Sequence, residues 1–105
     1  MEQFSLAIHG GAGTILKEDM TTALEQAYFN GLEDALAAGY AVLSAGGSAV
    51  NAVKTSIVVL EDNLLFNAGR GSVFTKKGLQ EMDAAIMDGK DLSAGSVAGI
   101  TLANS

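Results

Sequence analysis

The sequence contains no cysteine, no proline and no tryptophan, and it has one histidine among its 105 residues. Without cysteine, neither a disulfide framework nor a thiolate metal site is available. His9 has no second imidazole with which to share a metal, and a Ser-His-Asp arrangement would have to use this one. A lone histidine after an apolar run is more often a hydrogen-bonded core residue than a catalyst.

Basic residues are also scarce, because six lysines and arginines face twelve aspartates and glutamates, which gives a formal net charge of −6. No basic patch is present, which argues against nucleic-acid binding as the main role. No apolar run reaches the length of a membrane helix, and the first residues lack the basic and apolar regions of a targeting signal. We therefore expect a cytoplasmic protein that binds neither nucleic acid nor membrane.

Apolar residues and glycine are plentiful by contrast. Hydrophobic residues make up 49% of the chain, there are 13 glycines, and aromatic residues account for only 6%. This composition favours a core built by close approach of backbones rather than by large rings. A chain of this length forms one domain or part of one.

The first half of the chain predicts a strand followed by two helices. Residues 4–9 are typical of a buried strand, which ends in a glycine-rich turn at 10–13. Asp19 is the expected N-cap of a long helix, which Gly46 and Gly47 end. Its apolar positions recur every three or four residues, at Leu24, Tyr28, Leu32, Leu36, Tyr40 and Leu43, with Gly31 and Gly39 near the same side.

A second helix is expected from the cap Ser48 to about Asn63, with apolar residues over most of its circumference, so that it is buried on more than one side. It ends in acidic residues, with no lysine or arginine near its last turn, and this charge opposes the helix dipole. Two interpretations remain open: solvated carboxylates, or a bound cation that collects the free carbonyls of the helix end. Charge alone favours the first.

The remaining chain predicts three short strands at residues 72–75, 80–87 and 95–102, joined by turns. The fold class is therefore α+β: a strand, two helices that cover one face of a sheet, and a three-stranded meander. Aspartates near the turns suit local hydrogen bonding, at Asp83, Asp88 and Asp91.

The loop at residues 64–75 places Asn67 among small residues, where a carboxamide can offer two donors and one acceptor without titrating. The plain alternative is a helix-to-strand connection whose asparagine and glycines satisfy turn geometry, and residue types alone favour it. The turn at His9–Gly13 suggests a phosphate cradle, but its spacing matches neither the dinucleotide fingerprint nor the P-loop.

Several motifs occur in order along nearly the whole chain: residues 9–13 (HGGAG), 60–61 (LE), 65–75 (LFNAGRGSVFT), 82–89 (MDAAIMDG) and 94–99 (AGSVAG). Together they resemble the N-terminal part of the isoaspartyl peptidase/L-asparaginase family, the plant-type asparaginases among the N-terminal-nucleophile hydrolases. The resemblance implies an αββα sandwich from a precursor that cleaves itself into α and β subunits, which assemble as an (αβ)2 dimer. Residues 1–105 would be the N-terminal portion of that single domain, incomplete without a β-subunit segment.

In this family a threonine that begins the β subunit attacks the carbonyl of asparagine or of an isoaspartyl dipeptide, and its free α-amine serves as base. No threonine of this chain has the matching context, so we expect the nucleophile outside it and the chain alone to be inactive. The resemblance implies active-site support by Asn67, which holds the threonine, and by His9, Gly10 and Gly11. It also implies no organic cofactor, and a structural sodium ion on the main-chain oxygens of Leu60, Glu61, Asn63, Phe66, Ala68 and Arg70.

The sodium prediction reverses the preference at the helix end in favour of a bound cation. Leu64 departs from the family pattern, which often has proline at this place, and the leucine leaves the loop more freedom and an additional amide donor. The alternative function, from a different class, is a non-catalytic scaffold or interaction module that acts through its exposed sheet edge.

Overall fold

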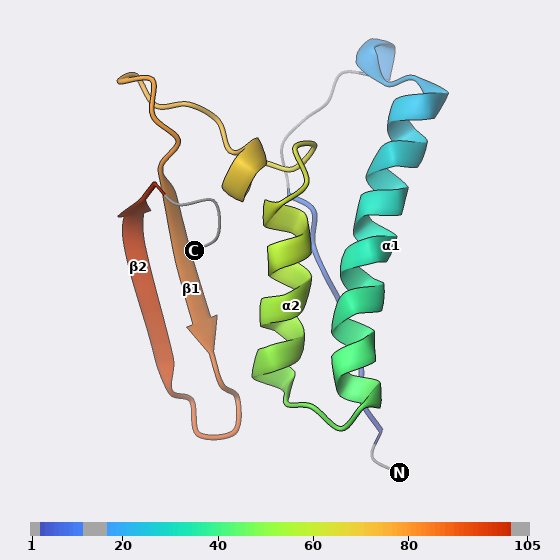
Figure 1. Ribbon diagram of the computed structural model, residues 1–105, viewed down its shortest axis with the longest axis vertical. Helices are drawn as coiled ribbons and strands as arrows, with labels where there is room; N and C mark the ends of the chain where they lie inside the picture. Colours follow the sequence, from blue (N-terminus) through green and yellow to red (C-terminus); the bar gives the residue numbers. More distant parts are fainter. Residues whose placement is uncertain (1–2, 12–16, 102–105) are drawn as a thin grey trace.

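The computed structural model describes residues 3–11 and 17–101, and it has an α+β fold (Figure 1). The elements in chain order are the 3₁₀ helix η1 (Lys17–Asp19), the α-helices α1 (Thr22–Ser44) and α2 (Ala49–Glu61), the 3₁₀ helix η2 (Gly69–Gly71), and the strands β1 (Met82–Met87) and β2 (Ala94–Ile100). The two α-helices form an antiparallel pair, and α2 lies between α1 and the β1–β2 hairpin. Within the described ranges, neither helix has the length and apolar content to cross a bilayer.

Local capping signals explain most helix boundaries. Helix α1 ends in a Schellman motif: Gly46 takes a φ of +83°, its N–H donates to Leu43, and the N–H of Gly47 donates to Val42. The Oγ of Ser48 accepts from the N–H of Asn51 at 3.1 Å and begins α2. The glycine stop and the Ser48 cap are therefore confirmed.

The predicted start of α1 was wrong by two residues. Asp19 lies inside η1, whereas Thr21 has the extended backbone of an N-cap and its Oγ1 accepts from the N–H of Leu24 at 3.0 Å. A 3₁₀ turn precedes the helix because the N–H of Met20 bonds to the carbonyl of Lys17. Thr21 is thus the residue whose side chain reaches the free amides of the first turn.

Small residues form the deepest contact between α1 and α2. Gly31, Ala35 and Gly39, spaced four apart on α1, are buried. The Oγ of Ser56 on α2 donates to the Ala35 carbonyl at 2.7 Å, so its hydroxyl is satisfied inside the core. The glycine prediction is confirmed here, while some of the expected large apolar residues stay at the periphery, and Tyr40 is 57% exposed. Close helix approach leaves room only for residues without large side chains between the axes.

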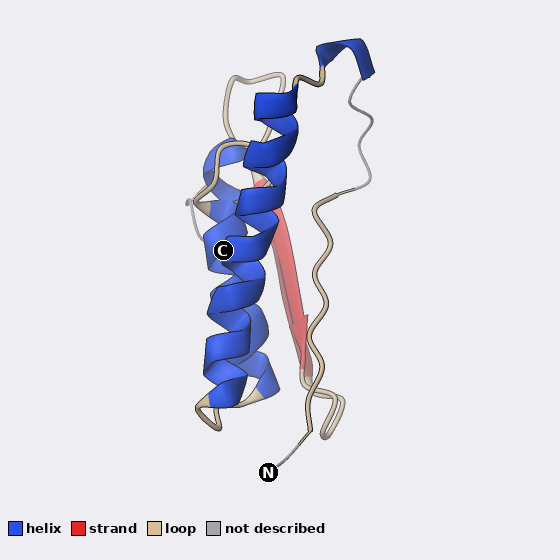
Figure 2. Cartoon of the chain, turned by 90° about the vertical axis from the view of Figure 1, so that its right-hand side faces the viewer, coloured by secondary structure: helices blue, strands red, loops and turns tan. Residues whose placement is uncertain are grey.

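Residues 4–9 do not form the predicted strand. They run extended beside the helical pair (Figure 2), where Phe4 packs edge to face on Tyr40 with ring centroids 5.1 Å apart. Leu6 lies against Gly39, and Ile8 packs on the core cluster. The segment has the apolar pattern of a strand, but among the described residues no neighbouring strand pairs with it.

The predicted three-stranded meander is a two-stranded antiparallel hairpin in the described part of the chain. Strands β1 and β2 pair from Met87 with Ala94 to Met82 with Ile100, and the register shifts between Met82 and Ala84. Residues 72–75 contribute only an isolated bridge, between Phe74 and Gln80. Residue 102, the expected end of the third strand, lies outside the described residues.

The hydrophobic core lies at the end of α2 that leads into the following loop. Ala35, Leu60 and Phe66 form it, with partly buried apolar residues around them. Phe66 meets Tyr28 edge to face, with ring centroids 5.7 Å apart. Burial of a ring of this size stabilises the fold by about 1.5–3 kcal/mol, so Phe66 anchors the loop to the helices.

Candidate functional site

The loop after α2 is wound tightly by its own backbone and by Asn63. The Oδ1 of Asn63 accepts from the N–H of Leu65 at 3.0 Å, and its carbonyl accepts from the N–H of Phe66 at 3.2 Å. These bonds form an Asx turn and a β-turn around Leu64, which is 74% exposed. The turn directs Phe66 into the core and leaves the next residue, Asn67, at the surface of the loop.

Asn67 is fixed by a bond within its own loop. Its Oδ1 accepts from the N–H of Val73 at 2.9 Å, which closes residues 67–73. The residue is exposed, and it lines a pocket of about 250 Å³ between the end of α2, the loop and the start of β1. The Val73 bond therefore uses one lone pair of the carboxamide oxygen and fixes its orientation, while the NH2 group keeps two donors that this bond does not use. Such a group can hold a partner oxygen at a defined position.

The first glycine turn lies against the same loop through Phe66. A Cβ on Gly10 would lie 3.2 Å from both the Phe66 ring and the Leu32 side chain, so the backbone here packs without room to spare. Gly11 has a φ of +115°, and its N–H donates to Nδ1 of His9 at 2.9 Å. His9 is exposed and bonds within its own turn rather than in a core. Residues 12 and 13 of the motif lie outside the described residues.

The pocket has an acidic wall that sequence reasoning did not predict. Glu61, Glu81 and Asp83 line it together with Asn67. Glu61 is only 4% exposed. The sequence predicts for this residue either a solvated carboxylate or a cation bound by its main-chain oxygen, and neither includes a buried side chain. Asp83 accepts from the N–H of Gly99 at 3.1 Å across the hairpin. The apolar residues around most of α2 were the signal that its last turn would be buried on more than one side.

The carbonyls expected to bind sodium largely accept bonds within the loop. The carbonyls of Leu60, Asn63, Phe66 and Ala68 accept from the N–H groups of Asn63, Phe66, Ala68 and Gly71, and the Arg70 carbonyl accepts from Gln80. A carbonyl oxygen has two lone pairs, so one such bond leaves a position for a cation. A Cβ on Gly71 would fall against the carbonyl oxygens of Leu64 and Phe66, so this loop is a tight, oxygen-lined turn.

These neutral oxygens are the donor type that a hard cation prefers. Within the described part of the chain, no group of three or more histidine or acidic side chains is placed to hold a metal ion. The main-chain oxygens therefore fit a sodium ion in chemistry, and the ion itself stays a prediction.

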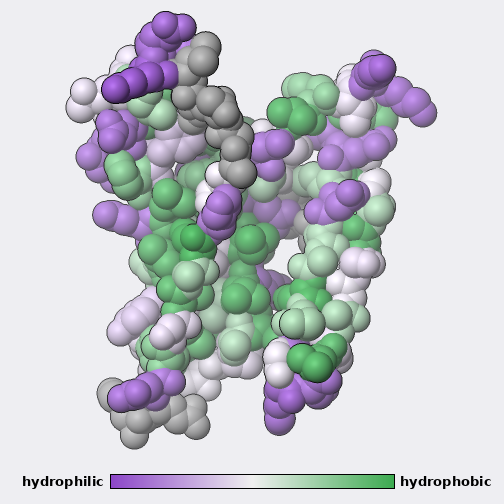
Figure 3. Space-filling view, turned by 180° about the vertical axis from the view of Figure 1, so that it is seen from behind, coloured by the Kyte–Doolittle hydropathy of each residue, from purple (hydrophilic) through white to green (hydrophobic). Residues whose placement is uncertain are grey.

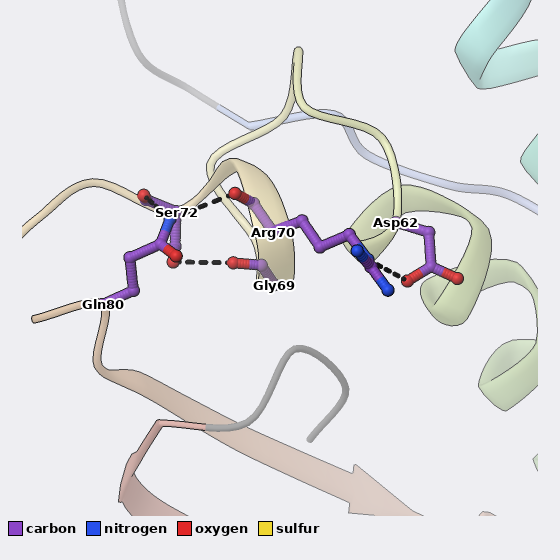
Figure 4. A network of polar contacts seen from close by, with 5 residues as sticks. All are labelled: Asp62, Gly69, Arg70, Ser72 and Gln80. Atoms are coloured by element: carbon purple, nitrogen blue, oxygen red, sulfur yellow. Dashed lines mark hydrogen bonds and ion pairs between the residues drawn. The ribbon is translucent and has the colours of Figure 1, made fainter.

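Arg70 provides the positive charge that the sequence did not show near the end of α2. Its Nε lies 3.4 Å from Oδ1 of Asp62, the C-cap residue, and the two side chains are 63% and 47% exposed (Figure 4). A surface pair of this kind contributes about 0–1 kcal/mol. Both interpretations of the acidic helix end leave out this ion pair, because Arg70 lies eight residues after Asp62 in the sequence and only the loop brings the two together.

Gln80 is the other residue that sequence reasoning missed. Its Nε2 donates to the carbonyl of Arg70 at 3.0 Å and to that of Ser72 at 2.7 Å, and the Ser72 hydroxyl donates to the carbonyl of Gly69 at 2.7 Å. Figure 4 shows these contacts around η2. They connect the start of the hairpin to the loop that carries Asn67.

Comparison with known proteins gives consistent relatives. A family model described as asparaginase matches residues 2–105. The chain is 50% identical to an isoaspartyl peptidase/L-asparaginase of Xenopus laevis over 95 residues, which are 90% of this chain and 29% of the relative. It is 52% identical to a plant-type L-asparaginase of Pyrococcus abyssi over 96 residues, 91% of this chain and 30% of the relative.

An isoaspartyl peptidase of Salmonella typhimurium is 43% identical over 101 residues, which are 96% of this chain and 32% of the relative. The chain thus spans about three tenths of the length of these curated relatives. Because the family model covers nearly every residue, the chain belongs to the asparaginase family.

Proposed function

We propose that this chain is the N-terminal part of the α subunit of an isoaspartyl peptidase/L-asparaginase, which hydrolyses L-asparagine and isoaspartyl dipeptides with a threonine outside residues 1–105. The supporting observation is the Asn67 carboxamide, held by Val73 at the edge of a pocket. Asn67 lies within the longest of the motifs that carry the family resemblance. The Gly10 turn packs on the same loop through Phe66.

In this proposal the chain positions the nucleophile and does no covalent chemistry. A threonine at the start of another polypeptide attacks the side-chain carbonyl with its hydroxyl, and its free α-amine takes the hydroxyl proton and passes it to the amide nitrogen as the C–N bond breaks. The nitrogen leaves as ammonia or as the amine of the second amino acid, and water then hydrolyses the acyl-threonine ester to release aspartate. Asn67 donates from its NH2 group to an oxygen of that threonine, while the bond from the Val73 N–H to its Oδ1 fixes the orientation of the carboxamide. A fixed donor of this kind keeps the hydroxyl in the orientation for attack, which accounts for a large part of the rate of such reactions.

The wider assembly is part of the same proposal. The hairpin and the helical pair would form one α layer and part of one sheet of an αββα sandwich, completed by a β-subunit segment, in a cytoplasmic (αβ)2 dimer. A sodium ion on the oxygens of Leu60, Glu61, Asn63, Phe66, Ala68 and Arg70 would hold the loop by charge–dipole attraction. The support for the ion is the oxygen-lined turn at Gly71.

Two measurements on the full protein test this function. Intact mass analysis and N-terminal sequencing should find either a second polypeptide that begins with threonine or a longer precursor.

Aspartate release from asparagine and from an isoaspartyl dipeptide should fall about 100-fold in Asn67→Ala, because the nucleophile loses its restraint. Asn30→Ala is the matched control, since Asn30 lies on α1 and bonds to Gln26. Full turnover in Asn67→Ala would overturn the assigned role.

The alternative, a non-catalytic interaction module, is favoured by one observation. A groove of about 810 Å³ lies between α2 and the hairpin, with mainly apolar walls that include Val53, Ile57 and Ile86 (Figure 3). A groove of this kind suits a polypeptide partner. If the full protein carries no threonine-led subunit and releases no aspartate, this second function replaces the first.

A further inference from the structure

One side chain connects the start of the hairpin to two carbonyls of the Asn67 loop. Gln80 is the second member of the isolated bridge with Phe74, and the turn between them is closed by the N–H of Thr75, which donates to the Leu79 carbonyl at 2.7 Å. The backbone of Gln80 is thereby fixed beside the loop, and its side chain is partly buried. The turn therefore fixes the point from which the Gln80 side chain extends, and partial burial restricts the conformations that the side chain can adopt.

The carboxamide uses both donors of one nitrogen. Nε2 bonds to the Arg70 carbonyl at 3.0 Å and to the Ser72 carbonyl at 2.7 Å, which are ten and eight residues away along the chain (Figure 4). A neutral NH2 group has two N–H bonds, so each carbonyl receives one. A glutamate of the same shape would place an acceptor against two acceptors, and an apolar side chain would leave both without this donor.

The two bonds fix the Arg70–Gly71 and the Ser72–Val73 peptide units. Ser72 is held by Gln80 through its carbonyl and by Gly69 through its hydroxyl. The Ser72 carbonyl and the Val73 N–H belong to the same peptide unit. Because this unit is planar, a bond that fixes the direction of the carbonyl also fixes the direction of the N–H. Gln80 therefore orients the N–H that binds Oδ1 of Asn67 at 2.9 Å.

We propose that Gln80 is a positioning residue for Asn67: by holding the Ser72–Val73 peptide unit and the Arg70 carbonyl, it keeps the Asn67 carboxamide in one orientation. Its effect on the loop follows from the contacts above. Its effect on turnover rests on the proposed function, because only then does the orientation of Asn67 matter for a reaction.

Amide hydrogen exchange in the full protein tests the effect on the loop without any substrate. In Gln80→Met, which keeps length and volume but has no donor, exchange at the Val73 N–H should become about tenfold faster, as expected when a hydrogen bond of ordinary net strength is lost. Exchange at Ala35, in the core of α1, should stay within twofold of the wild-type value. Gln26→Met is the matched control, since Gln26 donates to Asn30 on the α1 surface.

Gln80→Glu separates donation from packing. The carboxylate keeps the shape and should speed Val73 exchange at least as much as Gln80→Met does. Equal acceleration at Val73 and Ala35 would mean general destabilisation and would overturn the proposal, as would unchanged Val73 exchange in both variants.

Steady-state kinetics then tests the effect on catalysis. For the full protein, kcat of Gln80→Met should fall about tenfold with KM changed less than twofold, because a misplaced Asn67 affects the nucleophile and not the retention of substrate. If wild-type protein shows no hydrolysis, the proposed function fails while the exchange result still stands. If wild type is active and Gln80→Met has the wild-type kcat, the positioning role fails and the proposed function stands.

Discussion

The helical pair and the hairpin are stabilised in different ways. The helices bury Ala35, Ala52 and Leu60 where they pack closely, and Phe66 packs in one cluster with Ala35 and Leu60. The hairpin has one buried residue, Met82, whereas Ile86 and Met87 are 43% and 58% exposed. The helical pair therefore depends on packing, and within the described residues the hairpin depends on its ladder of hydrogen bonds and on its turn.

The difference locates the site at the boundary between the two regions. A two-stranded hairpin by itself is marginally stable in water, whereas a packed helical pair resists opening. The Asn67 loop is anchored to the packed region by Phe66 and to the hairpin by Gln80. The rigidity of the loop on the helix side therefore comes from van der Waals contact, and on the hairpin side from two hydrogen bonds.

The largest effect in this comparison is expected from adding one methyl group to the helical contact. A Cβ on Gly39 would meet Oγ of Ser56, and would lie 2.9 Å from Leu6 and 3.1 Å from the Ala52 carbonyl. Ser56 must then move and lose its bond to Ala35. Gly39→Ala should lower the free energy of unfolding by about 1–3 kcal/mol in denaturant titration, although alanine has the better helix propensity.

Gly89→Ala is the matched change in the hairpin turn, where a Cβ meets nothing within 4 Å. The free energy of unfolding should stay within about 0.5 kcal/mol of wild type. Stabilisation by Gly39→Ala would show that propensity outweighs packing in α1, and the contrast between the regions would not hold.

Local signals predicted the elements better than the contacts between them. The Ser48 cap, the Gly46 stop and the paired strands around the turn at 88–93 depend on neighbours in sequence, and the structure confirms them. A strand at residues 4–9 needs a partner strand, which apolar pattern cannot supply, and this prediction was wrong.

The site shows the same division between local and distant effects. The position of Asn67 in a turn among small residues could be expected from residue types. The burial of Glu61, the return of Arg70 to Asp62 and the two bonds of Gln80 join residues that only folding brings together. The roles proposed for Asn67, Gly10 and Gly11 and for the sodium ligands stay predictions.

A smaller effect, of opposite sign, is expected at the boundary itself. Leu64 is the second residue of the turn that the Phe66 N–H closes on the Asn63 carbonyl, a position that favours proline. Leu64→Pro should raise the free energy of unfolding by about 0.4–1 kcal/mol, because proline restricts the unfolded chain. Leu64→Ala is the control, since it also removes the exposed side chain but leaves the backbone free. Destabilisation by proline alone would mean that the turn requires the N–H or another φ at this position.

The smallest effect concerns the solvent-exposed turn of the hairpin, where charge and hydrogen bonds act without burial. The Ser93 hydroxyl donates to Oδ1 of Asp91 at 2.6 Å, and together with the Ser93 N–H it lowers the pKa of Asp91 below its ordinary 3.8. A carboxyl with a lowered folded-state pKa stabilises the fold above its unfolded pKa, and this contribution is lost as pH falls through the folded value.

Ser93→Ala should raise the pKa of Asp91 toward 3.8 in an NMR titration, but not fully, because the backbone donor remains. Ser5→Ala should leave the titration of Asp91 unchanged. Since the turn carries little of the packing energy, a large loss of stability in Ser93→Ala at neutral pH would show that the hairpin is anchored through this turn, and would reverse the contrast with the helical pair.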